Sequence, residues 1–258
     1  MGSMREVFTE YFLMRAVQER LMTTPVRRIE YHHAGEFLDL ASALRAGLDL
    51  SQAQLRVEYD HGLTVFVNRH SRQEWVVRWA GMSYTLPPTG WLVSDGRALL
   101  AYSALVAGNR ADAVRCPDYT FLNVRSDLAR RIEGITTDGA VALVRSGVPG
   151  RRDLFVCDCK SVAEAEELVR LSERADFSLI HRSESEIEMC VLDSDSGQSV
   201  TVTVASFGGA WEQDSLLLEE READEWRRAP NQVQQTRRGI QIARLRPDVV
   251  YRLSAPTS

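Results

Sequence analysis

The sequence predicts a mainly β protein: an antiparallel β-sandwich with an N-terminal helix and a second β-rich module. Three observations support this prediction. Apolar and polar residues alternate in many short runs, tight turns that contain glycine separate those runs, and one stretch near the start has helical spacing instead. The 258 residues are 44% hydrophobic, which is enough apolar chain for one large core or two smaller ones.

The first segment, from about Arg5 to Met22, is predicted to be a helix. Its apolar residues recur three to four positions apart, at Val7, Tyr11, Met14, Val17 and Leu21, with Phe8 and Phe12 widening the stripe. A stripe this broad needs a partner surface, either on the domain that follows or on a domain upstream. A second, short helix is predicted over 38–48, with Asp39 as a candidate N-cap.

From Leu55 onward the apolar period is two, which is typical of strands with one buried face. Two hairpins are predicted, one turning at His61-Gly62 and one at Ala80-Gly81. Pro87-Pro88 ends the second hairpin, because proline cannot donate to a strand ladder. The strands predicted in this half cover residues 55–59, 63–67, 75–79, 82–86, 91–93, 99–106 and 111–116, and a final pair flanks Asp138-Gly139.

Residues 145–152 (Arg-Ser-Gly-Val-Pro-Gly-Arg-Arg) are the best candidate for a linker. Three parts are therefore predicted: residues 1–30 as helix and connector, 31–145 as a β-sandwich, and 146–258 as a second β-rich domain with one helix. The alternative is one continuous large sandwich. The elements predicted after the linker are a strand at 154–157, a helix at 162–175, strands at 187–191 and 200–204 around a turn at 193–197, and a last strand at 249–253.

Charge and hydropathy exclude two classes of partner. With 31 basic and 36 acidic residues the net charge is −5, so the basic excess of a general nucleic-acid binder is missing. No stretch reaches the roughly 18 apolar residues that cross a bilayer, so we expect no membrane contact. Met1-Gly2-Ser3 resembles a cloning remnant before a start at Met4, and the sequence assigns no compartment. Four cysteines are too few for a disulfide scaffold, and we expect them buried and reduced.

Signals for catalysis are weak. The sequence contains neither a nucleophile elbow nor a phosphate-binding glycine loop, and no two acids are spaced as a glycosidase pair. His32, His33, His61 and His70 are expected in surface or structural roles, so no metal or other cofactor is predicted. Asp193 to Gly197 is expected to be a hairpin turn. A free-standing enzyme with a site around His32, His61 and Asp60 stays open as an alternative.

The aromatic residues give one candidate binding site. Trp75 and Trp79 share a strand face with Val77 and are expected in the core, whereas Trp91 follows a proline-rich loop that places it near a rim. Sugar rings stack on aromatic side chains, so we expect any bound glycan at Trp91, with Asn68 and Asp95 hydrogen bonding to its hydroxyls. In the competing interpretation Trp91 caps the core. Exposure of Trp91, Trp211 and Trp226 would discriminate between binding and structural roles.

Four strings in this order carry a family resemblance: Tyr31-His32-His33, Gly62–Asn68 (Gly-Leu-Thr-Val-Phe-Val-Asn), Tyr84–Trp91 (Tyr-Thr-Leu-Pro-Pro-Thr-Gly-Trp) and Tyr102–Val106 (Tyr-Ser-Ala-Leu-Val). They resemble the C-terminal β-sandwich region that follows the catalytic barrel in large bacterial glycoside-hydrolase-like proteins. The resemblance covers residues 11–143. It implies a non-catalytic accessory module, with the catalytic acids on an upstream barrel or partner chain, so no catalytic residue is assigned here. The alternative is a carbohydrate-binding module.

A second resemblance concerns the end of the chain. Leu245, Pro247 and Tyr251 form a Leu-x-Pro-x-x-x-Tyr string similar to the tyrosine corner of fibronectin type III domains and related sandwiches. The resemblance implies that the hydroxyl of Tyr251 bonds back to the backbone. It also implies an immunoglobulin-like end domain.

Overall fold

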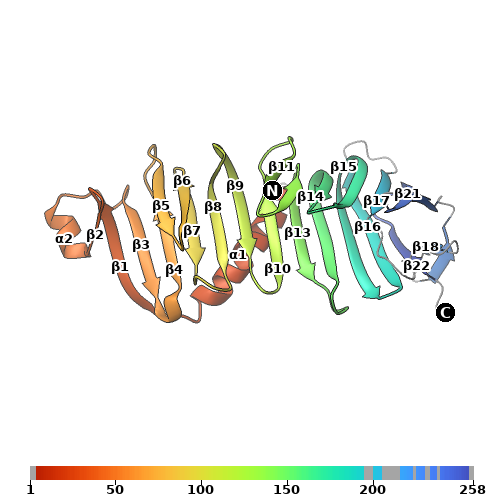
Figure 1. Ribbon diagram of the computed structural model, residues 1–258, viewed down its shortest axis with the longest axis horizontal. Coiled ribbons are helices and arrows are strands. Elements are labelled where there is room, and N and C mark those ends of the chain that lie inside the picture. Colours follow the sequence, from red (N-terminus) through yellow and green to blue (C-terminus); the bar gives the residue numbers. More distant parts are fainter. Residues whose placement is uncertain are drawn as a thin grey trace. The chain divides into compact units, whose positions relative to one another are not determined.

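The computed structural model describes residues 4–194, 200–204, 216–222, 225–229, 233–236 and 239–255. Their backbone contacts divide the chain into two compact units. The first unit is Thr9–Arg125, and the second consists of the described residues of 126–258 together with the start of the chain up to Phe8. Antiparallel strands dominate both units, so the predicted mainly β fold with an N-terminal helix is confirmed (Figure 1). The division into segments 1–30, 31–145 and 146–258 stays a prediction.

The first unit is built on one antiparallel sheet (Figure 1). Its strands, in spatial order, are β2 (Glu36–Leu38), β1 (Val26–His33), β3 (Gln54–Tyr59), β4 (Thr64–Asn68), β7 (Trp91–Ser94), β8 (Leu100–Val106), β9 (Asn109–Arg115) and β10 (Tyr119–Asn123). The hairpin predicted around His61-Gly62 is confirmed as β3 and β4. His61 adopts a left-handed φ of 61° in the turn.

Helix α1 (Met4–Leu21) covers one face of this sheet. The ring of Phe12 packs 5.6 Å from that of Tyr119 and 6.0 Å from that of Phe121, measured between centroids. The Tyr119 hydroxyl donates to the Phe12 carbonyl at 2.7 Å, which fixes the helix over β10. Only part of the predicted stripe is buried, because Tyr11 is 54% exposed and Val7 58%. No helix in the described part of the chain is long and apolar enough to cross a membrane.

A hairpin covers the opposite face of the same sheet. It consists of β5 (Trp75–Trp79) and β6 (Met82–Leu86), as predicted. The rings of Trp75 and Trp79 lie 5.9 and 5.5 Å from that of Phe66 on β4, so both tryptophans pack on the sheet as expected. At the sheet's edge, α2 (Leu40–Arg45) begins at Asp39, whose carboxylate accepts a hydrogen bond from the Ser42 backbone at 2.7 Å.

The second unit is a sandwich of two sheets that share the long strands β14 (Arg152–Ala163) and β15 (Glu167–Ser183). One sheet adds β13 (Ala140–Arg145), β16 (Glu186–Ser194), β22 (Val250–Ser254), β18 (Leu217–Glu222) and β19 (Glu225–Arg228). The other adds β11 (Arg130–Ile132), β12 (Ile135–Thr137), β17 (Val200–Val204), β21 (Gly239–Leu245) and β20 (Val233–Thr236). Strands that switch sheets at a bulge form the corner of such a sandwich.

The corner lies at the middle of β14. Asp158 has a φ of 48°, and the register of β14 against β15 shifts on both sides of Cys159. β12 and β13 meet at Asp138-Gly139, opposite this bulge. They do not pair with each other, because each pairs with a different half of β14. At this position β14, β15 and the β12–β13 connection all pass from one sheet to the other.

Two predictions in this half are corrected. The helix predicted over 162–175 is wrong, because these residues belong to β14, β15 and the turn between them. Residues 145–152 are not an extended linker but close the hairpin between β13 and β14, where Arg145 lies opposite Arg152. The turn predicted at 193–197 lies largely outside the described residues.

The tyrosine-corner hydrogen bond is present. Tyr251 on β22 is fully buried, and its hydroxyl accepts a hydrogen bond from the backbone N–H of Arg246 at 3.0 Å. The bond joins the end of β21 to β22. It satisfies the only polar atom of a large core side chain.

Candidate functional site

A single row of cross-strand neighbours runs over the face of the first unit that α1 partly covers. Directly paired residues point to the same side of a sheet. The row contains Leu38, Tyr31, Leu55, Val67, Trp91, Ser103, Asp112 and Asn123, on β2, β1, β3, β4, β7, β8, β9 and β10. Its apolar members from Tyr31 to Trp91 are half-buried, whereas the three polar members are buried. The change from apolar to polar occurs between Trp91 and Ser103.

A tight turn at residues 87–90 positions Trp91 in this row. Gly90 donates its N–H to the Pro87 carbonyl at 2.7 Å, and Asn68 donates its backbone N–H to Gly90. A β-carbon at position 90 would come within 2.6 Å of the Pro87 ring, so glycine is required there. The half-buried indole of Trp91 is thus held at the start of β7 by a fixed backbone.

Asp112 is the buried acid of the row. Its side chain has no exposed surface, and its Oδ2 accepts a hydrogen bond from Nε of Arg125 at 2.6 Å. Within the described residues its Oδ1 has no hydrogen-bond partner. Such an unsatisfied buried acceptor is costly, on the order of 1–3 kcal/mol, and requires an explanation.

Arg110, two residues before Asp112 on β9, and Asn123, its partner on β10, make further hydrogen bonds near this acid. Arg110 donates from Nε to Ser103 Oγ at 3.0 Å and from its terminal nitrogens to the oxygens of Thr89. Burial lowers the pKa of Arg110, and the nearby Arg125 charge adds to the effect while Asp112 opposes it. Asn123 donates to Thr9 Oγ1 at 2.9 Å and accepts from the Arg125 backbone N–H at the same distance. The loop before Trp91 and the strand after Asp112 are therefore both tied to the row.

Asn68 and Trp91 lie at the same end of β4 and β7, but Asn68 is fully buried. Its amide nitrogen donates to the carbonyls of Gln73, Leu86 and Pro87, at 2.7, 2.9 and 3.1 Å. Its oxygen accepts from the His70 N–H at 3.1 Å. Asn68 thus holds the loops that flank Trp91, with its amide already occupied.

Asp95 follows the far end of β7. It lies four positions after Trp91, which is about 13 Å along a strand. Its Oδ1 accepts the backbone N–H groups of Arg97, Ala98 and Leu99, at 2.9, 2.8 and 2.9 Å. Burial opposes ionisation of Asp95, but these bonds and the nearby Arg20 together hold its pKa below the ordinary value. The structure therefore does not bring Asp95 to the same place as Trp91 and Asn68.

Trp211 and Trp226 are the other tryptophans whose exposure was to separate a binding role from a structural one. Trp226 on β19 is half-buried, and the guanidinium of Arg252 lies 4.3 Å from its ring centroid. Trp211 lies outside the described residues.

The histidines do not gather. His32 contacts Gln54 through Nδ1 at 3.1 Å and packs against Phe37 and Trp75. His61 lies in the β3–β4 turn beside Asp60. Among the described residues, no three His, Cys, Asp or Glu side chains are close enough together to hold a metal ion.

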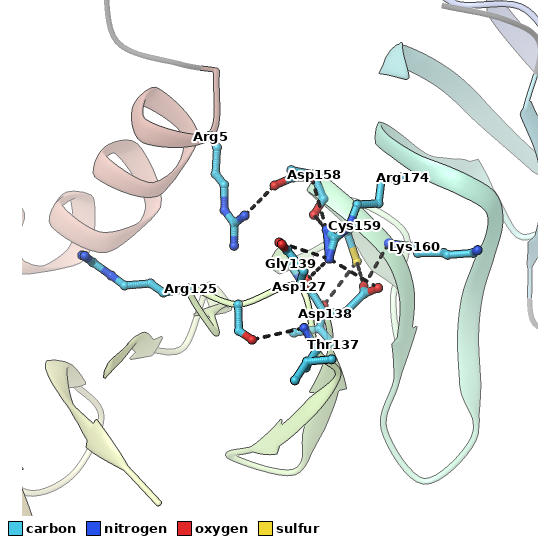
Figure 2. Close-up of polar contacts among 12 residues, drawn as sticks. Arg5, Arg125, Asp127, Thr137, Asp138, Gly139, Asp158, Cys159, Lys160 and Arg174 are labelled. Carbon is cyan, nitrogen blue, oxygen red and sulfur yellow. Dashed lines mark hydrogen bonds and ion pairs between the residues drawn. The ribbon is translucent and has the colours of Figure 1, made fainter. Parts of the chain in front are cut away.

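A second polar cluster lies at the sandwich corner of the other unit (Figure 2). Arg174 donates to the carbonyl of Asp138 at 2.6 Å and to the carbonyl and carboxylate of Asp158, while Arg5 pairs with that carboxylate. Asp138 Oδ1 accepts the N–H groups of Lys160 and Ser161 and the Cys159 thiol. Burial works against the Asp138 charge, but these bonds outweigh it and lower its pKa.

These corner contacts hold the three strands as they change sheets. They join four consecutive residues of β14, from Asp158 to Ser161, to Arg174 on β15 and to Asp138 in the β12–β13 connection. Burial also raises the pKa of the Cys159 thiol to about 12, so this thiol is a poor nucleophile near neutral pH. We therefore interpret the corner as structural.

Sequence reasoning missed the roles of Asp112 and Arg110. One local signal was available, because Arg110 and Asp112 alternate with Ala111 and Ala113 inside a strand and so share one face with buried Val114. A charged pair on the apolar face of a strand indicates a buried polar cluster. The chain matches no family model and no curated protein.

Proposed function

We propose that this chain is a non-catalytic accessory β-sandwich module of a carbohydrate-active, glycoside-hydrolase-like protein. The observation that carries the proposal is the location of the four resembling strings. They occupy β1, β4, β6–β7 and β8, all in the unit Thr9–Arg125, and β4, β7 and β8 are direct neighbours in its sheet. Three strings that are weak singly thus meet in one part of the sheet, and the fourth, on β1, is separated from them by β3.

The chemistry of the candidate residues supports a non-catalytic role. The Asn68 amide, the Asp95 carboxylate and the Asp138 carboxylate use their hydrogen-bonding capacity on backbone groups of the fold. Asp112 Oδ1 has no partner within the described residues, but Asp112 has no exposed surface that a substrate could reach. General acids, bases and nucleophiles need a free reactive atom beside the substrate. In this proposal the catalytic acids belong to a separate barrel domain or a partner chain.

Incubation with a panel of chromogenic α- and β-glycosides tests the proposal. We expect no release of the chromophore above the buffer rate. Turnover that co-purifies with the folded chain and is abolished by heat unfolding would overturn it. A barrel-encoding segment upstream of Met4 in the parent reading frame would support it.

Carbohydrate binding is the second candidate function. The specific observation that favours it is Trp91, whose half-buried indole lies beside the buried polar group of Ser103 and Asp112. Binding and accessory roles are compatible, because a module that contacts substrate need not cleave it.

A further inference from the structure

We propose that two copies of this chain associate through an apolar part of the first unit's sheet that α1 leaves uncovered, so that the two sheets pack face to face. This surface, the open apolar face, lies on the side of the sheet that carries α1. Its members are the apolar side chains of β2, β1, β3, β4 and β7 on that side: Leu38, Val26, Ile29, Tyr31, Leu55, Val57, Tyr59, Val67 and Trp91. The inference does not depend on the proposed function.

Helix α1 crosses only the other part of this side of the sheet. Thr9, near its start, accepts a hydrogen bond from Asn123 on β10. Near its end, Nη1 of Arg20 lies 3.4 Å from Oδ2 of Asp95, just after β7. The helix therefore runs from β10 to the end of β7, as Figure 1 shows, and β1 and β3 lie beyond it.

The exposure of the side chains follows the edge of the helix. Along one row of paired residues it falls from 47% at Ile29 on β1 to 8% at Val65 on β4 and 2% at Val93 on β7. Val26, at the start of β1, is exposed as well. The described residues of this unit thus cover the sheet at β7 and leave it open at β1.

The open apolar face has the composition of an interaction surface. All its members are aliphatic or aromatic, and none carries a charge. A contiguous exposed patch of this kind marks an interaction site on a soluble protein. Because no charge lies within the patch, an identical surface brings no like-charge pair into the centre of the contact. Two copies therefore cover each other in an isologous contact, which closes as a dimer.

The size of the open apolar face suits a dimer. It extends over four strand spacings from β2 to β7 and five residue steps from Val26 to Tyr31, a footprint of about 19 by 17 Å, or roughly 320 Å². The accessible surface follows the contour of each side chain and is larger than this flat footprint. A stable interface of standard size buries roughly 800 Å² on each partner, of which about 450 Å² is apolar. The open apolar face thus supplies the apolar centre of such an interface.

The height of α1 above the sheet also fits a second sheet. A helix with its side chains is about 10–12 Å across. Sheets that pack face to face lie about 10 Å apart. A partner's sheet on the open apolar face therefore lies beside α1 at the same height, and it continues the layer that α1 begins on this side of the sheet.

Sedimentation equilibrium of the whole chain tests the proposal between about 1 and about 300 μM, because interfaces of this size include those with micromolar affinity. We expect the average mass to rise toward twice that of one chain. A mass that stays at that of one chain over the whole range would overturn the proposal. Growth past two copies would also contradict it, because an isologous contact closes.

A matched pair of variants locates the contact. Ile29→Asp places a charge where the dimer buries it, so we expect the dissociation constant to rise by about tenfold or more. Val76→Asp is the control, because Val76 is likewise exposed on a strand, but on β5, which covers the opposite side of the sheet. This control should dimerise as the wild type does. Equal dimerisation of Ile29→Asp and the wild type would place the contact elsewhere and refute the proposal.

A measurement on the wild type decides the question if Ile29→Asp does not fold. Methyl-labelled and unlabelled chains are mixed, and NOEs between the two copies are recorded by isotope-filtered NMR. We expect these NOEs at the methyl groups of Ile29, Val57 and Val67. A dimer that shows no NOE between copies at these methyl groups would refute the proposal.

Discussion

Gly139 lies directly against Asp158 at the corner of the sandwich. A β-carbon at position 139 would overlap the Asp158 carbonyl and lie 2.9 Å from the Cα of Cys159. These are backbone atoms of β14, held on their other side by Arg174. The close approach lets the β12–β13 connection and β14 pass from one sheet to the other at the same position.

We therefore predict that Gly139→Ala destabilises the protein by at least the 1–3 kcal/mol typical of overpacking, because about one methyl group must be accommodated by backbone movement. The control is Gly147→Ala, where a β-carbon meets nothing within 4 Å. The free energy of unfolding of this control should stay within about 0.5 kcal/mol of the wild-type value. Chemical denaturation of both variants measures the difference, and equal stabilities would show that the corner relaxes freely.

Asn68 supports a second prediction. Its buried amide donates to three carbonyls, so Asn68→Asp replaces a donor with a buried negative charge that faces acceptors. We expect a loss of about 2–4 kcal/mol in the free energy of unfolding. Asn109→Asp is the matched control, because exposed Asn109 makes one bond to the Ala107 carbonyl. A structural role is refuted if the two variants unfold at the same denaturant concentration.

Local sequence patterns predicted the hairpins well. Leu55 to Val67 alternate around His61-Gly62, and a hairpin needs no information beyond that segment. The helix predicted over 162–175 is wrong because a helical and a strand period compete in that segment. Val162, Ala165, Leu168 and Val169 fit a helix, whereas Val169 and Leu171 also fit a strand, and pairing with β14 and β17 favours the strand.

The candidate site was less predictable, because its geometry depends on contacts between distant parts of the chain. Trp91 was visible because a proline-rich loop precedes it. The burial of Asp112 depends on pairing with β8 and β10, and the occupation of Asn68 depends on loops up to 19 residues away. Neither relationship is contained in the neighbouring residues of the sequence.

Tyr251 gives the third prediction. Its hydroxyl accepts the Arg246 N–H while its ring fills the core. Tyr251→Phe keeps the ring and leaves that N–H without its acceptor, so we expect a loss of about 1–3 kcal/mol in thermal or chemical unfolding. Tyr11→Phe removes the hydroxyl of an exposed ring and serves as the control. A loss of stability no larger than the control's would mean that water replaces the hydrogen bond between Arg246 and Tyr251 at no cost.

His181 makes stability depend on pH. Its side chain is buried on β15, and burial lowers its pKa below the ordinary value, although hydrogen bonding and charge from Asp153 oppose this. The unfolded chain therefore binds a proton at a higher pH than the folded chain does. Below the ordinary histidine pKa of about 6.5, protons favour the unfolded state, so stability falls as the pH falls.

We predict that the free energy of unfolding of the wild type decreases between about pH 7 and pH 5, and that His181→Gln flattens this slope. Denaturant titrations at several pH values measure it, and comparing slopes makes the test independent of any uniform loss of stability in the variant. His33→Gln, at an exposed position, should keep the wild-type slope. If His181 were instead stabilised as a cation by Asp153, the variant would lose stability most at low pH, and its slope would become steeper than that of the wild type.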